Sequence, residues 1–216
     1  IMGLLDKSFK VSGEAFFNGT NLLNLSSEKK RRIRGKEIGM ILQNPMTSFD
    51  PLYRINAQME ETFLEHTKLT AKEIKMKSIE VLEQMKIKDP KDVLKKYPHQ
   101  LSGGMLQRIM IGLSLALKPK LIIADEPTTA IDSITQYEII EEFINIKSNH
   151  DVAMIFISHD LGVISKVADD VIVMHQSKVV EQGALEDVFQ NTSDAYTKSL
   201  IEKRLVVMEK FKKLII

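Results

Sequence analysis

The sequence has 216 residues, of which 44% are hydrophobic and 27% are charged, a composition typical of a globular protein with its own core. Thirty Lys and Arg residues balance 29 Asp and Glu residues, so the net charge of +1 gives no bulk attraction for nucleic acid. The absence of cysteine excludes disulfides, thiolate metal sites and cysteine nucleophiles within these residues. No apolar run approaches the ~20 residues needed to span a bilayer, so we expect a soluble domain.

The first part of the chain contains two predicted strands. Residues 14–17 form the first strand, and the pair Asn18 and Gly19 after it is a strong signal for a tight turn. Residues 36–42 form an apolar strand that Pro45 stops.

A basic helix is expected between these two strands. Ser26 or Ser27 caps it, and the charge run at 28–32 lies in its first turns. We interpret this run as a solvated helix face, and a nucleic-acid patch is the alternative.

The middle of the chain, residues 53–118, changes in character to helix. Thr70 and Glu73 form a capping box ahead of a lysine-rich helix. Asp89 is expected to cap a further short helix that begins at Pro90. An apolar helix covers 103–117. This block separates two parts that contain strands, which indicates an inserted helical subdomain.

After Pro119, strands and helices alternate. Continuous apolar runs at 121–124 and 152–157 predict strands that are buried on both faces. An amphipathic helix is predicted over 134–146, and a third strand over 171–174. The alternation predicts a parallel α/β sheet with crossover helices.

The last predicted element is a basic amphipathic helix over residues 195–214. A solvated terminal helix is one interpretation, and contact with a membrane surface is the other. These patterns divide the chain into a partial core over 1–52, a helical subdomain over 53–118, a second core part over 119–190 and a terminal helix over 191–216.

Two adjacent carboxylates follow the predicted strand at 121–124. Asp125 and Glu126 would therefore lie at the carboxyl edge of a parallel sheet, where ligands bind. Asp125 would hold Mg²⁺ and Glu126 would polarise an attacking water. The alternative is a strand that happens to end in acidic loop residues.

A second signal is Ser102 with Gly103 and Gly104 at the start of a predicted helix. Such a helix start exposes backbone N–H groups and the positive end of the helix dipole, an arrangement that suits a phosphate. A plain serine cap followed by permissive glycines is the alternative.

Three single residues carry weaker signals. Gln43 at a strand end is a possible Mg²⁺ ligand or water-positioning group, and His159 follows the predicted strand at 152–157. Taken alone, a histidine at this place is more often structural than catalytic. Asp132 alone reads as the cap of the helix that follows it.

In combination and in this order, these features resemble the ATP-binding cassette (ABC) ATPases. The string LSGGM at 101–105 is similar to the family signature, and LIIADE at 121–126 to the Walker B strand with its catalytic glutamate. Gln43 matches the Q-loop, residues 130–132 the D-loop, and His159 the switch histidine. The resemblance implies an α/β fold: a P-loop-NTPase-like core, in which a parallel sheet with flanking helices is joined by an antiparallel β part, with an inserted all-helical subdomain.

Longer strings indicate a narrower group within that family. Residues 43–51, 97–105 and 125–130 resemble the ATPases of oligopeptide, dipeptide and nickel importers, and among these the "D" type, which includes importers of metals and metallophores.

The phosphate-binding P-loop, G-x-x-x-x-G-K-[ST], does not occur in the 216 residues. Because every later motif is intact, we expect a P-loop segment ahead of residue 1. A half-cassette that binds no nucleotide is the alternative. We also expect exposed apolar faces on the strands at 121–124 and 152–157.

The resemblance implies roles for the candidate residues. Glu126 acts as base toward water, His159 holds the γ-phosphate, and Asp125 and Gln43 serve Mg²⁺, with Gln43 also counted as catalytic. Two ATPase subunits face each other head to tail, so that the signature contacts the ATP of the partner. The residues expected to bind nucleotide are Ser102, Gly103, Gly104, Met105, Gln107 and Asp132.

The implied function is an ATPase, with ATP and Mg²⁺ as cofactors, that energises an importer of nickel, other metal chelates or short peptides. Its partners would be a second ATPase subunit in a heterodimer, two membrane permease subunits and an extracellular solute-binding protein, with no nucleic acid. The implied location is peripheral, on the cytoplasmic face of a bacterial cell membrane. A non-transport ABC ATPase acting on nucleic acid or ribosomes is the alternative.

Overall fold

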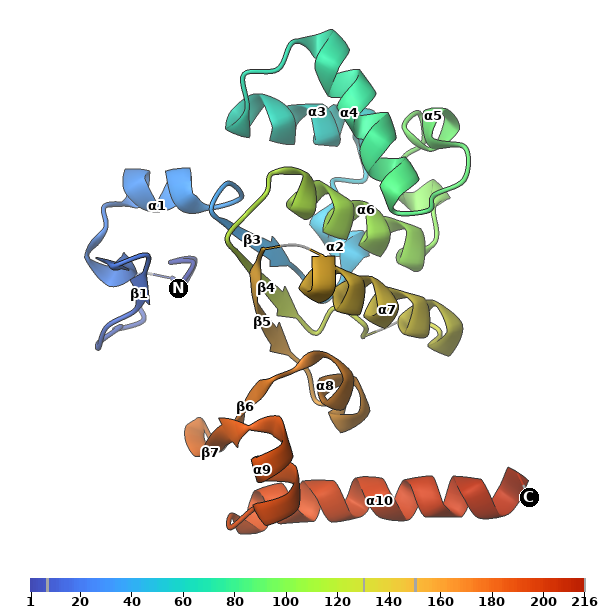
Figure 1. Cartoon of the computed structure of the whole chain (residues 1–216). Helices are drawn as coiled ribbons and strands as arrows, with labels where there is room; N and C mark the ends of the chain where they lie inside the picture. Colours follow the sequence, from blue (N-terminus) through green and yellow to red (C-terminus); the bar gives the residue numbers. More distant parts are fainter. Residues whose placement is uncertain (7, 130, 150, 216) are drawn as a thin grey trace.

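The computed structural model describes residues 1–6, 8–129, 131–149 and 151–215, and side chains as far as residue 206. A three-stranded parallel sheet lies at its centre (Figure 1), in the order β3-β4-β5. Its register aligns the carboxyl ends of the strands, since Ile41 pairs with Ala124 and Asp125 with Ile157. The strands are β3 (Ile38–Ile41), β4 (Leu121–Asp125) and β5 (Ala153–Ile157).

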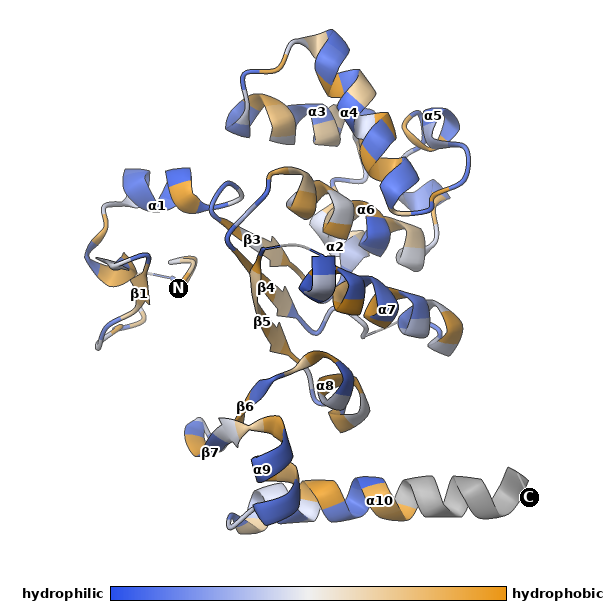
Figure 2. Cartoon of the chain, in the orientation of Figure 1, coloured by the Kyte–Doolittle hydropathy of each residue, from blue (hydrophilic) through white to orange (hydrophobic). Residues whose placement is uncertain are grey.

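The main hydrophobic core fills one face of this sheet. Ile122 and Ala124 of β4 point into it and are fully buried, together with Leu106 and Phe143 from two covering helices. Figure 2 shows the apolar strands in the middle of the molecule, with polar residues on the outer turns of these helices. The helices on this face are α6 (Gly103–Ala116), α7 (Ser133–Asn149) and α8 (Leu161–Val167).

The opposite face of the sheet is covered near β3 by the N-terminal elements. Leu22 packs there against Ile38 and Ile123 in a smaller cluster. The expected tight turn is present, because Asn18 and Gly19 both have positive φ. These elements are β1 (Phe16–Phe17), β2 (Thr20–Asn21), a 3-10 turn η1 (Leu22–Asn24) and α1 (Ser27–Ile33).

The helix α1 carries its charges on the surface, as the solvated interpretation requires. Ser26 is its cap, accepting a hydrogen bond from the backbone N–H of Lys29. The exposed Arg31 pairs with Glu65 at 2.7 Å, which uses one of the basic side chains within the protein itself.

Helices from the middle of the chain share the main core with the sheet. The capping box is confirmed, since the backbone N–H of Thr70 donates to the Glu73 carboxylate at 2.7 Å. The expected side-chain cap by Asp89 is wrong, because Asp89 adopts a left-handed backbone and makes no capping hydrogen bond. These elements are α2 (Pro45–Ser48), α3 (Ile55–His66), α4 (Ala71–Gln84), α5 (Pro90–Val93) and the 3-10 turn η2 (Pro98–Gln100).

Three expectations about the strands are corrected. The strand β4 is covered on both faces because it is central, so its apolar face is not exposed, whereas Ile155 and Ile157 of β5 are 39% and 45% exposed. Hence β5 packs against the core through one face only, with Met154 and Phe156 partly buried, and its other face is exposed as expected. The third strand, β6 (Asp170–His175), is not paired with the parallel sheet in the described residues.

Instead, β6 pairs in antiparallel fashion with β7 (Lys178–Ala184). Gln176 and Ser177 between them have positive φ values of 48° and 61°, which closes a tight hairpin. The turn places β7 directly beside β6, so β6 finds its backbone hydrogen-bond partners in the next strand of the chain.

The chain ends in two helices, α9 (Leu185–Asn191) and α10 (Ala195–Ile215), and the second confirms the predicted terminal helix. Asp194 caps α10 by accepting hydrogen bonds from the backbone N–H groups of Tyr196 and Thr197. Among the helices described, none has a stretch long and apolar enough to span a bilayer.

Candidate active site

The adjacent ends of β4 and β5 bring Glu126 and His159 together. The backbone N–H of Glu126 donates to the carbonyl oxygen of Ile157 at 3.0 Å, which ties the first residue after β4 to the end of β5. Glu126 has a positive φ of 46°, a conformation that costs roughly 1 kcal/mol for a residue with a side chain. The fold therefore holds this carboxylate in a strained position at the sheet edge.

The Glu126 side chain is held by two groups. Its Oε1 lies 2.7 Å from Nδ1 of His159, and its Oε2 accepts a hydrogen bond from the Thr129 hydroxyl at 2.5 Å. Thr129 is a site residue that the sequence reasoning missed, although it lies in the loop that follows the two carboxylates. The Glu126 side chain is 20% exposed and that of His159 is 75% exposed, so the imidazole lies on the surface beside a largely covered carboxylate.

These contacts shift both protonation equilibria in the direction of an ion pair. The hydrogen bond from Thr129, and then that from His159, lowers the pKa of Glu126. The same contact with Glu126 raises the pKa of His159. Glu126 is therefore an ionised carboxylate at neutral pH, able to accept a proton.

Asp125 and Gln43 lie at the same edge on neighbouring strands. Asp125 is the last residue of β4, and the exposed Gln43 lies two residues beyond the end of β3. A carboxylate and an amide oxygen fit a Mg²⁺ site that takes its remaining ligands from phosphates and water. The described residues hold no group of three or more His, Cys, Asp or Glu side chains that could bind a metal unaided.

The predicted phosphate-binding helix start is formed by α6. The exposed Ser102 caps it, with Oγ accepting from the backbone N–H of Met105 at 3.3 Å. An added Cβ at Gly103 would meet nothing within 4 Å, whereas at Gly104 it would lie 2.3 Å from Cγ2 of Thr135. Gly103 thus leaves open space at the helix start, and Gly104 allows α6 to approach the first turn of α7.

Asp132 lies at the start of α7, where it acts as a cap. Its Oδ1 accepts from the backbone N–H groups of Thr135 at 3.0 Å and Ile134 at 3.2 Å. These hydrogen bonds, that of Thr135 first, lower the pKa of Asp132. Ala130, part of the predicted D-loop, lies outside the described residues.

Gln107 requires a correction. It is completely buried, and its side-chain amide has no hydrogen-bond partner among the described residues. A side chain enclosed in this way is not on the surface that would face the nucleotide of a second subunit. The helical spacing from Ser102 turns Gln107 toward the core.

The remaining candidates are not joined to the central pair. No hydrogen bond or ion pair recorded for the described side chains links Gln43, Ser102 or Asp132 to Glu126 or His159. The structure therefore forms one cluster, in which Glu126 contacts His159 and Thr129. The start of α6 with Ser102 is not part of this cluster.

The chain is similar to proteins of one known family. The family model described as "ABC transporter" matches residues 1–129. The metal-staphylopine import system ATP-binding protein CntD of Staphylococcus aureus (strain NCTC 8325 / PS 47) is 50% identical over 212 residues, which are 98% of this chain and 78% of that protein. The chain belongs to the ABC transporter family. It is an ATP-binding subunit of that family, an ATPase.

Other relatives of this ABC ATPase are ATP-binding proteins of peptide transport. The dipeptide transport ATP-binding protein DppD of Haemophilus influenzae is 41% identical, with 93% of this chain matched to 61% of that protein. The oligopeptide transport ATP-binding protein OppD of Bacillus subtilis is 42% identical, with 88% matched to 53%. These relatives give no support to a non-transport ATPase acting on nucleic acid or ribosomes.

The predicted fold class is confirmed by solved structures. A post-hydrolysis dimer of the ATP-binding cassette MJ0796, bound to ADP and phosphate, superimposes with a TM-score of 0.71 at 24% identity, covering 81% of this chain and 74% of that one. The cassette CbiO1 of Clostridium perfringens gives a TM-score of 0.70 at 25% identity and covers 99% of this chain and 79% of that one.

The Glu126–His159 pair predicts a pH-dependent stability of this ABC ATPase. The raised pKa of His159 gives a contribution that is complete below about pH 6.5, the unfolded value, and is lost as the pH rises through the folded value. The lowered pKa of Glu126 gives a contribution that is present above about pH 4.3 and is lost as the pH falls through the folded value. The ion pair is therefore fully formed between about pH 4.3 and 6.5.

His159→Asn should lower the free energy of unfolding most within that range, by less than about 1 kcal/mol because the histidine is largely exposed. Urea unfolding of both proteins from pH 4 to pH 9 measures the difference, which should shrink toward alkaline pH. His99→Asn is the control, since this exposed histidine stacks on Tyr97 and pairs with no carboxylate among the described residues. A difference that is constant with pH would contradict the assignment.

Proposed function

We propose that this chain is the ATP-hydrolysing subunit that energises an importer of metal–chelate complexes. The observation that carries the proposal is the Glu126 carboxylate at the sheet edge, held between Thr129 and His159. A carboxylate that is ionised at neutral pH and fixed at the edge where ligands bind can accept the proton of an attacking water.

His159 has a second ring nitrogen for the substrate. Its Nδ1 faces Glu126, so its Nε2 is available to donate a hydrogen bond to a γ-phosphate oxygen. The imidazole would then hold the base and the phosphate at a fixed separation. Phosphoryl transfer depends mainly on such positioning and on charge stabilisation.

Asp125 and Gln43 are the residues proposed to hold Mg²⁺. Their position on neighbouring strand ends and their oxygen donors support this role. The metal ion would neutralise charge on the β- and γ-phosphates.

The start of α6 is proposed to bind the γ-phosphate of ATP held by a second subunit. Ser102, Gly103 and Gly104 present backbone N–H groups at the positive end of a 14-residue helix. Met105 follows them in the first turn, and Asp132 would lie at the subunit boundary. The burial of Gln107 supports a role in packing this helix rather than in nucleotide contact.

The proposed assembly contains a second, different ATPase subunit, two membrane permease subunits and an extracellular solute-binding protein. The chain would bind peripherally at the cytoplasmic face of the membrane. The relation to CntD supports a metal–chelate cargo, and short peptides are a second candidate because DppD and OppD are also related at more than 40% identity.

An uptake assay separates the two cargoes. The assembled transporter in proteoliposomes, with its solute-binding protein, would be given a radioactive nickel chelate or a labelled dipeptide. We expect ATP-dependent uptake of the metal chelate, and none when Glu126→Gln replaces the natural subunit. Uptake of the dipeptide alone would favour the second candidate, and uptake of neither would contradict both.

A further inference from the structure

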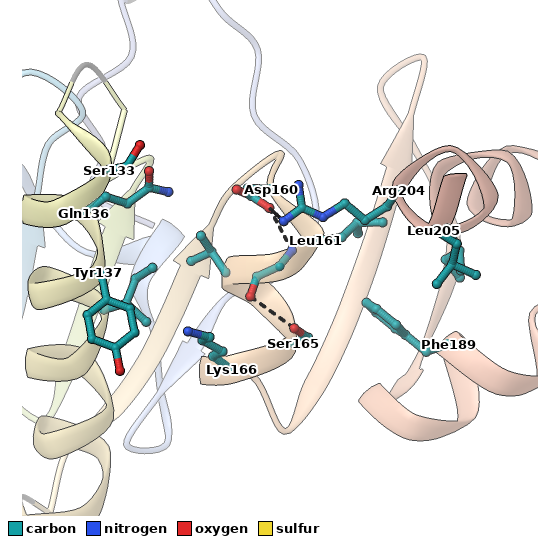
Figure 3. A pocket seen from close by; sticks show the side chains of 14 residues that line it. Ser133, Gln136, Tyr137, Asp160, Leu161, Ser165, Lys166, Phe189, Arg204 and Leu205 are labelled. Atoms are coloured by element: carbon teal, nitrogen blue, oxygen red, sulfur yellow. Dashed lines mark hydrogen bonds and ion pairs between the residues drawn. The ribbon is translucent and has the colours of Figure 1, made fainter. Parts of the chain in front are cut away.

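We propose that Arg204, on the C-terminal helix α10, is a positioning residue for His159 that acts through Asp160. The proposal rests on the proposed function, because it assumes that His159 takes part in hydrolysis. Its basis is the contact between Nη2 of Arg204 and Oδ1 of Asp160, at 3.5 Å. Figure 3 shows the Arg204 side chain extending from its helix toward Asp160.

Asp160 organises the turn that carries His159. Its Oδ1 accepts from the backbone N–H of Gly162 at 2.7 Å, which caps α8. Its own backbone N–H donates to the Ser158 hydroxyl at 3.0 Å. His159 lies in the chain between Ser158 and Asp160, which this hydrogen bond joins, so a displacement of Asp160 changes the direction in which the exposed imidazole points.

The guanidinium of Arg204 is packed over Gly162. A Cβ added to Gly162 would lie 2.4 Å from Nη2 of Arg204 and 3.1 Å from Oδ1 of Asp160. Glycine at this place therefore leaves the room that the guanidinium occupies. The ion pair needs that room to form.

The ion pair crosses a groove between α10 and the nucleotide-binding core. The groove has a volume of about 510 Å³ and is lined by residues of α7, α8, α9 and α10, among them Tyr137 and Phe189. Among the side chains described, Arg204 makes the ion pair that connects α10 to α8. The position of α10 is thus coupled to the turn of His159 by one charged contact.

The expected effect is modest in size. The Arg204 side chain is 44% exposed and that of Asp160 is 31% exposed, and a half-exposed ion pair changes an equilibrium by about two- to fivefold. Since the contact acts on a group that works during hydrolysis, the loss should appear in kcat rather than in KM for ATP.

Arg204→Met in the assembled transporter tests the proposal, because methionine keeps an apolar stem and removes the charge. We expect kcat to fall about two- to fivefold with unchanged KM and a thermal midpoint lowered by at most about 4 °C, and Arg204→Lys to restore much of the rate. Lys203→Met is the matched control on the neighbouring exposed residue. A wild-type kcat for Arg204→Met would overturn the proposal.

A double-variant cycle tests whether Asp160 is the intermediary. Asp160→Asn keeps an oxygen that can cap α8 and loses the charge, so it should lower kcat as Arg204→Met does. Adding Arg204→Met to Asp160→Asn should then cause no further loss. If Arg204→Met lowered kcat as much in the Asp160→Asn background as in the wild type, Asp160 would not be the intermediary.

Gly162→Ala displaces Arg204 without removing any charge. Alanine favours a helix more than glycine does, and the displaced group is the flexible end of a side chain, so the thermal midpoint should be unchanged or higher. The kcat should nevertheless fall, and a kcat at the wild-type level would count against the role of Arg204. Glu126→Gln in the same assay reports separately on the proposed function, because its outcome does not depend on Arg204.

Discussion

Glu126→Gln is expected to lower the rate of ATP hydrolysis by ~10²–10⁴-fold, the contribution of a positioned general base. Glutamine keeps the size of the side chain, and its amide can still contact Thr129 and His159, but it cannot take a proton from water. ATP binding should remain, because the change leaves the phosphate and Mg²⁺ contacts in place. Phosphate release and nucleotide binding by the assembled ATPase pair measure the two effects.

The variant should also accumulate a closed dimer with ATP bound, since hydrolysis no longer opens it. Glu83→Gln on the exposed face of α4 is a suitable control, because it removes a carboxylate that lies in a helix outside the Glu126 cluster. Turnover close to that of the wild type in Glu126→Gln would remove Glu126 from the catalytic role.

Ser102→Arg should abolish most hydrolysis at the ATP held by the partner subunit, by roughly 10²-fold or more, the loss seen when a group that stabilises developing charge is removed. The hydroxyl now caps α6, and the site is exposed with open space beside Gly103. A bulky arginine would fill that space and remove the cap. ATP binding by the mutated subunit itself should be little affected.

Mixed dimers, each with one defective subunit, test this expectation. Ser27→Arg is the matched control, because Ser27 is an exposed serine in the first turn of α1. Loss of nucleotide from the mutated subunit alone would show that the head-to-tail assignment is wrong.

Local chemistry in the sequence was sufficient to predict most elements and the residues at the ends of β4 and β5. The pair at 18–19 sets a turn by its backbone preferences, and the capping box of Thr70 and Glu73 sets a helix start, because such signals depend on neighbours within a few residues. The apolar run at 121–124 is followed by two carboxylates, which is enough to predict ligand-binding or catalytic side chains at the edge of a sheet.

The tertiary structure decided which of these residues meet. The contact between Glu126 and His159, 33 positions apart, follows from the register of β4 and β5, and Thr129 joins it through the shape of a loop. The helical position of Gln107 turns it into the core, although the resemblance had assigned it to nucleotide.

Which strands pair with each other could not be predicted from the local sequence either. The run at 171–174 has the apolar character of a sheet strand, yet β6 pairs with β7 because the hairpin turn brings that partner closer than the parallel sheet. The apolar residues of β5 point in alternation to a covered and an uncovered face, so Ile155 and Ile157 remain exposed. Hydrophobicity determines which segments form strands, whereas hydrogen-bond partners and covering layers come from distant parts of the chain and are decided only by the assembled fold.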